Sequence, residues 1–351
     1  MSLFEEAVRQ IEPIDTEWMR RAEARQLELT KPPGSLGRLE PIANRCAAIF
    51  ESLSFRLARP RIVVFAADHG VCAEGVSPYP QEVTAQMVLN FLHGGAAINC
   101  LARAGGIELQ VVDVGVAADL PAADGLIARR IAPGTRNFCD GPAMSLDQAR
   151  AALDVGVALA GEAALDGCGL LGIGEMGIGN TTAASALTAA LTGTTPAAVV
   201  GRGTGADDEC LRRKISAVER ALALHAGNLS APLELLARVG GLEIAALCGF
   251  CLGAARNRKP VVADGFIATA AAAVAVAMQP LVRDYLFAGH MSAEPGHAHL
   301  LRWIGVAPLL ALEMRLGEGT GAALAMQLIA GAAAAFTGMA TFSAAGVADR
   351  A

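Results

Sequence analysis

Residues 62–70 read Ile62-Val-Val-Phe-Ala-Ala-Asp-His-Gly70, a short apolar and β-branched run that ends abruptly in two polar residues and a glycine. A run that is apolar at every position is typical of a strand buried on both faces of a sheet. In the general pattern of the chain, an Ala-rich stretch with helical character comes after such a run. This alternation of a buried strand with a helix predicts a parallel, doubly wound α/β sheet with helices on both faces.

The same pattern recurs along the chain. Further strands are predicted at residues 109–115, 169–175, 197–203, 260–265 and 285–290. Ligands of doubly wound sheets bind at the carboxyl ends of the strands. Polar residues stand at all of these ends, namely Asp68-His69, Asp113, Glu175, Arg202, Asp264 and His290. We therefore expect a binding site along this edge of the sheet.

The two ends of the chain lack predicted strands. The first thirty residues alternate in charge with helical periodicity and stop at Lys31-Pro-Pro-Gly34, and the chain after about Pro308 is predicted to be helical. A chain of 351 residues is long enough for a main domain and a smaller one. We predict an α/β domain over residues 30–307, and a small helical domain built from residues 1–29 together with 308–351.

Composition argues against several classes of protein. The net charge of −6 and the aromatic content of 4% argue against nucleic-acid binding. Met1-Ser-Leu-Phe-Glu-Glu has neither a basic nor an apolar signal region, so we expect no secretory signal and a cytoplasmic protein. Residues 261–282 and 321–348 reach the length of a membrane span, but their Ala, Gly, Ser and Thr content favours helices buried in a core.

Cysteine and histidine patterns do not predict a metal site. The chain has eight cysteines, and Cys248-Gly-Phe-Cys251 is the one pair with redox or zinc spacing. That pair lies in an apolar run without a second pair, which favours structural cysteines. Residues 290–299 hold three histidines, but not at the spacing of a metal-binding motif. We expect these histidines to line a pocket.

Two glycine-rich loops are candidate phosphate sites. Gly172-Ile-Gly-Glu-Met-Gly177 fits the dinucleotide pattern G-x-G-x-x-G, but residues 188–200 lack the acid that would bind a ribose hydroxyl. The loop continues into Asn180-Thr-Thr182 at a helix start, which suits a phosphate. A second loop, Gly201-Arg-Gly-Thr-Gly205, leads into a helix predicted over residues 207–225.

Charged residues near the second loop have structural explanations. Asp207-Asp208 resembles a magnesium-pyrophosphate pair, but acids at a helix start also stabilise the helix dipole, and we favour that interpretation. Lys214 lies about two turns into the helix, where spacing alone favours a solvated face. Glu318 lies between Gly317 and Gly319 just before an apolar helix. It is either a dipole-stabilising acid or a carboxylate that approaches a ligand closely, and the pattern does not separate the two.

Read together, these segments resemble the nicotinate-nucleotide–dimethylbenzimidazole phosphoribosyltransferase family of cobalamin assembly. The resemblance runs in order from about residue 30 to 340. The matching segments are Lys31-Pro-Pro-Gly-Ser-Leu-Gly-Arg-Leu-Glu40, Ala66-Ala-Asp-His-Gly-Val71, Gly75-Val-Ser-Pro-Tyr-Pro-Gln81, Gly174-Glu-Met-Gly-Ile-Gly-Asn-Thr-Thr182, Gly201-Arg-Gly-Thr-Gly205, Gly289-His-Met-Ser-Ala-Glu-Pro-Gly-His297 and Leu316-Gly-Glu-Gly-Thr-Gly321.

The resemblance implies roles for particular residues. It implies that Glu318 is the catalytic base. It places the ribose phosphate at Glu175, Gly177, Gly203, Lys214, Gly265 and Ser292, and the base at Ser77, Gln86, Met176 and Leu316. It further implies a homodimer without cofactor or metal that acts on nicotinate mononucleotide and dimethylbenzimidazole. Two alternatives remain open: a nicotinamide-dependent oxidoreductase, and a non-catalytic nucleotide-binding protein.

Overall fold

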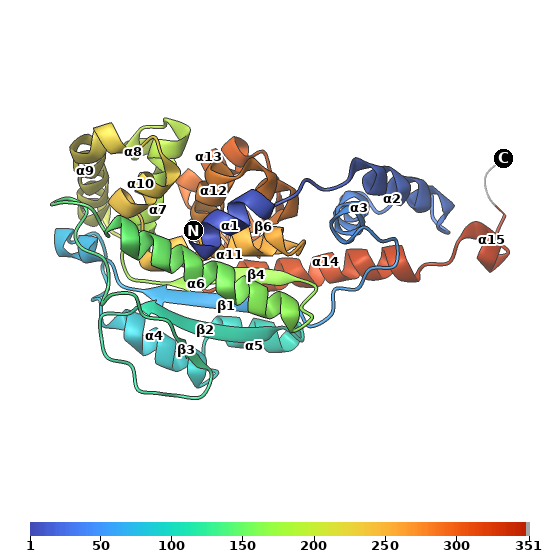
Figure 1. Ribbon diagram of the computed structural model, residues 1–351, viewed down its shortest axis with the longest axis horizontal. Helices are drawn as coiled ribbons and strands as arrows, with labels where there is room; N and C mark the ends of the chain where they lie inside the picture. The colour runs from blue at the N-terminus through green and yellow to red at the C-terminus, as the bar shows by residue number, and fades with distance from the viewer. Residues whose placement is uncertain (349–351) are drawn as a thin grey trace.

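The computed structural model describes residues 1–348 and contains a seven-stranded sheet whose strands are all parallel (Figure 1). The strands are β1 Arg61–Ala67, β2 Glu108–Gly115, β3 Leu126–Ala128, β4 Leu171–Met176, β5 Val261–Ala263, β6 Leu286–His290 and β7 Pro308–Leu310. Their order is β3-β2-β1-β4-β5-β6-β7. From β1 the chain adds β2 and β3 on one side, and then β4 to β7 in order on the other side. The predicted doubly wound sheet is therefore confirmed.

Helices connect most of the strands. They are α1 Leu3–Gln10, α2 Thr16–Glu28, α3 Leu39–Phe50, α4 Val83–Leu92, α5 Ala97–Ala104, α6 Leu146–Leu165, α7 Asn180–Thr192, α8 Pro196–Val199, α9 Asp208–His225, α10 Pro232–Val239, α11 Leu242–Arg256, α12 Phe266–Met278, α13 Pro295–Ile304, α14 Thr320–Gly338 and α15 Phe342–Ala345. Short 3₁₀ helices form η1 Gly70–Glu74, η2 Ala226–Asn228 and η3 Pro280–Tyr285.

The helices cover both faces of the sheet. Ile62 pairs in register with Gly172, and a Cβ built on Gly172 would lie 2.7 Å from the Met326 sulfur of α14. Phe65 is three residues after Ile62, so its side chain points to the opposite face of the sheet. Its ring contacts Phe250 of α11 edge-on, with centroids 5.9 Å apart. Thus α14 and α11 lie on opposite faces. α5 packs beside α14, and α6 and α12 pack on α11.

Two predictions about strands are wrong. Residues 197–203 do not form a strand, because Pro196–Val199 is helix α8. Pro196 stands in the first helical turn, where its fixed φ is favourable, and the alanines that follow favour a helix. The segment after Pro308 is not wholly helical, because Pro308–Leu310 forms β7. β7 is a three-residue edge strand, where a proline is tolerated and no long apolar run is needed.

The two ends of the chain meet. Leu29 and Thr341 form an antiparallel bridge, and the Thr30 amide donates to the Ala340 carbonyl at 3.0 Å. α3 packs on α2 and α14, whereas α1 packs on α6 and α11. In Figure 1 α2, α3 and α15 lie at the end of the molecule remote from α9 and α10. The division into domains at residues 29/30 and 307/308 stays a prediction.

Helix α14 is, among the described residues, the one helix long and apolar enough to cross a membrane. Half of its apolar window is buried, and it packs against α3, α5, β4 and β6. This packing is that of a core helix, as the sequence composition indicates.

Candidate active site

A cavity of about 580 Å³ opens at the carboxyl ends of β4, β5 and β6. Its volume lies in the range of small-molecule sites. Many residues assigned by resemblance line it, namely Glu175, Met176, Gly177, Gly203, Gly265, Ser292, Leu316 and Glu318. The remaining lining residues are Tyr79, Val83, Met87, Ile178, Asn180, Thr181, Thr204, Asp264, Phe266, Ile267, Ala268, His290, Glu294, Arg315 and Gly317.

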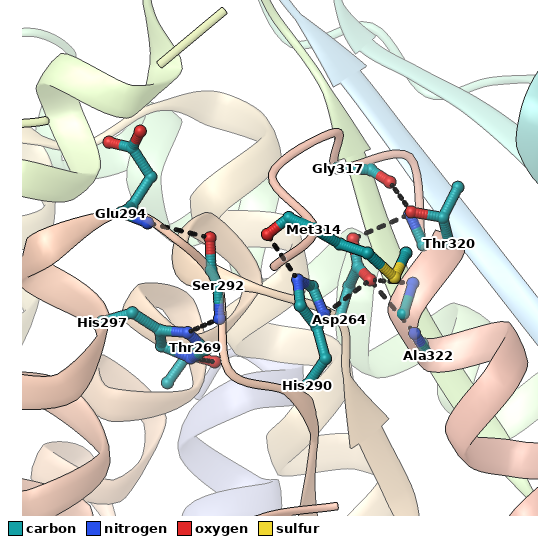
Figure 2. Close-up of polar contacts among 12 residues, drawn as sticks. Asp264, Thr269, His290, Ser292, Glu294, His297, Met314, Gly317, Thr320 and Ala322 are labelled. Atoms are coloured by element: carbon teal, nitrogen blue, oxygen red, sulfur yellow. Dashed lines mark hydrogen bonds and ion pairs between the residues drawn. The ribbon is translucent and has the colours of Figure 1, made fainter. Parts of the chain in front are cut away.

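Glu318 sits in a strained loop at the start of α14. Gly317, Glu318 and Gly319 have φ values of 88°, 63° and 91°, so three consecutive residues are left-handed. This conformation is uncommon for a residue with a side chain, and such strain concentrates at functional sites. Asp264 holds the loop, because its carboxylate accepts hydrogen bonds from the backbone amides of Gly319, Gly321 and Ala322 at 3.1, 2.6 and 3.0 Å (Figure 2).

The loop presses directly on the central strand β4. A Cβ built on Gly174 would lie 2.5 Å from the Gly319 nitrogen and 2.6 Å from the Glu318 carbonyl. No side chain fits between these two backbones. Gly174 therefore allows the Glu318 loop to reach its place above β4.

The carboxyl group of Glu318 is buried and incompletely bonded. The residue is 7% exposed, and its Oε2 has no hydrogen-bond partner among the described residues. Burial raises the pKa of Glu318, a hydrogen bond from the Ile98 backbone lowers it, and the Asp264 carboxylate raises it again. A carboxylate whose basicity is increased in this way, in a residue that lines a cavity, is suited to accept a proton.

A second carboxyl group lies beside this loop. Glu175 is the penultimate residue of β4, and its Oε1 would lie 2.4 Å from a Cβ on Gly317. The φ of Gly317 is 88°, a conformation that favours glycine. The Asn180 amide group donates a hydrogen bond to the other oxygen. Burial raises the pKa of Glu175 well above its ordinary value, and the carboxylates of Glu243, Asp264 and Glu318 raise it further.

Lys214 contributes a buried positive charge behind two lining residues of the cavity. The residue is 1% exposed, so the solvated position that spacing favours is wrong. Its Nζ donates to Thr181 Oγ1 at 3.0 Å and would lie 3.2 Å from a Cβ on Gly203. Burial lowers the pKa of Lys214, and the Glu294 carboxylate opposes this effect. Lys214 thus stands directly behind two cavity residues, Thr181 and Gly203.

Ser292 is held by a histidine that works as a neutral group. The Ser292 amide donates to His297 Nδ1 at 2.9 Å, and His297 Nε2 lies 3.0 Å from Thr269 Oγ1 (Figure 2). Nδ1 must therefore be unprotonated and Nε2 carries the hydrogen. Burial, with a smaller effect of His290, lowers the pKa of His297 to about 3. Of the three histidines expected to line a pocket, His290 lines the cavity, whereas His297 and His299 do not. No group of three His, Cys, Asp or Glu residues placed for a metal occurs within residues 1–348.

Two of the residues assigned to the base pocket lie outside the cavity lining. Ser77 Oγ accepts a hydrogen bond from the backbone amide of Tyr79, which does line the cavity. Gln86 is on α4, next to Met87, which also lines it. Ser77 therefore contacts a lining residue, and Gln86 is next to one in the sequence.

The glycines of Gly172–Gly177 are explained by packing. Gly172 lies under Met326 of α14, Gly174 under the Glu318 loop, and a Cβ on Gly177 would lie 2.4 Å from the Ala67 carbonyl oxygen. The match to a dinucleotide motif therefore has a structural cause. The Asp207 side chain accepts from the Cys210 amide at 2.7 Å and caps α9, which confirms the helix-start interpretation of this acid.

Three of the polar residues expected at strand ends, Asp68, Asp113 and Arg202, do not line the cavity. Asp68 accepts from the Ala117 amide at 2.7 Å, and Asp113 accepts from the Val116 amide at 2.8 Å. Arg202, which does not follow a strand, pairs with Asp208. These groups stabilise turns outside the cavity lining.

Other cavity residues were not singled out from the sequence. Glu294 and Arg315 belong to no recognised spacing, although Glu294 lies inside the histidine-rich segment and that segment could have identified it. The apolar residues Val83, Met87 and Phe266 look like ordinary core residues, and only the fold places them at the cavity.

Comparison with known proteins identifies the family. The profile of the phosphoribosyltransferase family matches residues 11–347. The chain is 53% identical over 349 residues to a nicotinate-nucleotide–dimethylbenzimidazole phosphoribosyltransferase of Geobacter sulfurreducens, covering 99% of each chain. It is 53% identical over 350 residues to one of Chloroflexus aggregans, covering 100% of this chain and 99% of the relative. A crystal structure of CobT from Thermus thermophilus matches with a TM-score of 0.92 at 53% identity, over 95% of this chain and 100% of that one. The chain belongs to the nicotinate-nucleotide–dimethylbenzimidazole phosphoribosyltransferase family.

Proposed function

We propose that the protein transfers the phosphoribosyl group of nicotinate mononucleotide to 5,6-dimethylbenzimidazole or a similar base. The products are nicotinate and α-ribazole phosphate, which supplies the lower ligand of cobalamin. The proposal rests on relatives that carry this name and share about half of their residues with the chain. The cavity of about 580 Å³ is of a suitable size for two small substrates.

The reaction requires a base but no metal. In nicotinate mononucleotide the ribose is bonded to a cationic pyridinium nitrogen, so nicotinate leaves with a neutral ring. A benzimidazole nitrogen attacks the anomeric carbon from the opposite face and inverts it. The ring becomes cationic and loses the proton on its other nitrogen to a neighbouring base.

The observation that carries the proposal is the position of Glu318. Its carboxyl group is buried at the cavity, has an oxygen without a partner among the described residues, and is held in a left-handed loop. We assign the proton transfer to this carboxylate, a role typically worth about 10²–10⁴-fold in rate. Its raised pKa makes it a stronger base than an exposed glutamate.

The other residues divide between the two substrates. We assign the ribose phosphate to Glu175, Gly177, Gly203, Lys214, Gly265 and Ser292. A glycine loop and a buried ammonium group supply donors of the kind that phosphate prefers. We assign the incoming base to Met176 and Leu316 at the cavity and to Ser77 and Gln86 just behind it. The Asn180 hydrogen bond holds the Glu175 side chain in place beside Gly317.

We further propose a cytoplasmic homodimer that binds no nucleic acid and needs no cofactor. The net charge of −6 and the scarcity of aromatic residues support the first exclusion. The contact between Leu29 and Thr341 supports a small helical domain built from the two chain ends.

A turnover assay tests the function. The protein is incubated with nicotinate mononucleotide and dimethylbenzimidazole, and free nicotinate and the riboside phosphate are measured. Nuclear magnetic resonance of the product assigns the anomeric configuration, which should be α. Binding without release of nicotinate would instead support a nucleotide-binding protein, and a β product would contradict the inverting attack.

A further inference from the structure

A carboxylate lies where the proposed phosphate site is. Glu294 directly precedes α13, is 7% exposed and lines the cavity. Its Oε1 accepts a hydrogen bond from the Gly203 amide at 2.8 Å, and its Oε2 has no partner among the described residues. Figure 2 shows its carboxyl group directed away from Ser292, whose Oγ accepts from the Glu294 amide at 3.3 Å.

The groups around this carboxylate are those that attract an anion. Lys214 Nζ would lie 3.2 Å from a Cβ on Gly203, and a Cβ on Gly201 would lie 2.2 Å from Glu294 Oε2. Arg315 Nη1 donates to the Gly203 carbonyl oxygen at 3.0 Å. Two cations and one carboxylate therefore converge on the Gly201–Gly203 loop.

We infer that Glu294 occupies the anion position of the phosphate site, and that the phosphate of the nucleotide reaches the Gly203 amide by displacing it. The inference rests on the proposed function. The Gly203 amide has a single hydrogen, which the carboxylate uses, so a phosphate oxygen cannot bond to it at the same time. A phosphate dianion in contact with an ionised carboxylate would also be repelled.

Glu294 has a structural reason to be there. A buried ammonium group without a nearby negative charge is costly, and Glu294 supplies that charge for Lys214. The arrangement also makes the site selective, because a ligand must bring its own anion to replace the carboxylate. A riboside without phosphate leaves the bond between Glu294 and Gly203 intact.

Glu294→Gln tests the inference. Glutamine keeps the size and the carbonyl oxygen that accepts from Gly203, so the loop is retained and only the charge is lost. Isothermal titration calorimetry measures binding of nicotinate mononucleotide and of nicotinate riboside. Glu209→Gln is the matched control, because that carboxylate is 72% exposed at the start of α9. We expect nucleotide affinity to rise about tenfold in Glu294→Gln, the effect of one charge within about 4–6 Å of an ionic group. Riboside affinity and the control should stay at wild-type values.

Other outcomes overturn the inference. Unchanged or weaker nucleotide binding in Glu294→Gln, with a normal thermal melt, would show that the carboxylate does not compete with phosphate. Equal weakening for nucleotide and riboside would place Glu294 on the ribose. A structure of the wild-type protein with nicotinate mononucleotide provides a check without mutation, and Glu294 still bonded to Gly203 there would overturn displacement. A wild-type protein that binds no nucleotide would instead overturn the proposed function, and this inference with it.

Discussion

Gly174 and Glu318 are in backbone contact, since a Cβ on Gly174 would lie 2.6 Å from both the carbonyl carbon and the carbonyl oxygen of Glu318. The atoms that a Cβ on Gly174 would meet are backbone atoms of the loop, so they cannot move aside as the end of a flexible side chain could. The place of the proposed base therefore depends on the absence of one methyl group in the centre of the sheet.

Gly174→Ala is expected to move the Glu318 loop and to destabilise the protein. Overpacking of this kind costs about 1–3 kcal/mol. A displacement of about 1 Å at a catalytic group can lower kcat about 10²-fold. Gly161→Ala on α6 is the control, because a Cβ there meets nothing within 4 Å. Chemical denaturation and steady-state kinetics measure both effects, and a Gly174→Ala enzyme with normal kcat would refute the dependence.

Lys214→Ala is expected to weaken binding of nicotinate mononucleotide by about 1.5–3 kcal/mol, the usual value of a hydrogen bond to a charged group. Affinity for free dimethylbenzimidazole should change little, because the proposed base pocket is formed by other residues. Lys259→Ala is the control, since Lys259 lies over the Phe50 ring, 5.6 Å from its centroid, and does not line the cavity. Calorimetric titration gives both affinities, and an unchanged nucleotide affinity would remove Lys214 from the phosphate site.

Glu175 is expected to make stability depend on pH. Its pKa in the folded protein lies well above the ordinary value of 4.5, so over the interval between the two values the folded state holds a proton that the unfolded state has lost. Below pH 4.5 the contribution of Glu175 to the free energy of unfolding is complete. As pH rises from there through the pKa of Glu175 in the folded protein, this contribution is lost, at no more than about 1.4 kcal/mol per pH unit for one proton. Glu175→Gln should flatten this decline in chemical denaturation measured from about pH 5 upward. The same slope in the variant and the wild type would contradict the assignment to Glu175.

The cysteines of α11 are expected to be structural. Cys248 and Cys251 are fully buried, and burial raises the pKa of Cys248 well above its usual value and that of Cys251 to about 12, so both remain thiols. Replacing both by Ala should cost about 1 kcal/mol at each site through lost packing. Turnover per folded molecule should stay near the wild-type value. Loss of turnover in a fully folded double variant would show that the pair has a chemical role.

Much of the fold was predictable because its central strands have a simple cause. β1, β2, β4, β5 and β6 each contain a short buried run of mainly apolar residues, and such runs are visible in a sequence. The edge strands β3 and β7 have three residues each and no continuous apolar run, so their pairing depends on tertiary contacts. At residues 197–203 the β-branched pair Val199-Val200 resembles a strand, but Pro196 and two alanines favour a helix.

The site residues likewise include some that the sequence reveals and some that depend on tertiary contacts. Glu318 between two glycines stands out in the sequence because the strained backbone requires those neighbours. Lys214 could not be placed from its spacing, since its burial depends on Thr181 and Gly203 from other segments. Glu294 lies inside the histidine-rich segment, but its contact with Gly203 could not be predicted, because the Gly201–Gly203 loop lies far earlier in the chain.

Glu318→Gln tests the central claim most directly. Glutamine keeps the size of the side chain and removes the basic carboxylate, and Glu313→Gln is the control, an exposed acid that is also left-handed, with φ 56°. Steady-state turnover with nicotinate mononucleotide and dimethylbenzimidazole is measured together with substrate affinities and a thermal melt. If Glu318 is the general base, kcat falls about 10²-fold or more while both substrates still bind and the protein stays folded. Turnover near the wild-type value in a folded Glu318→Gln protein would contradict the proposed mechanism and leave Glu318 as an acid that only stabilises the start of α14.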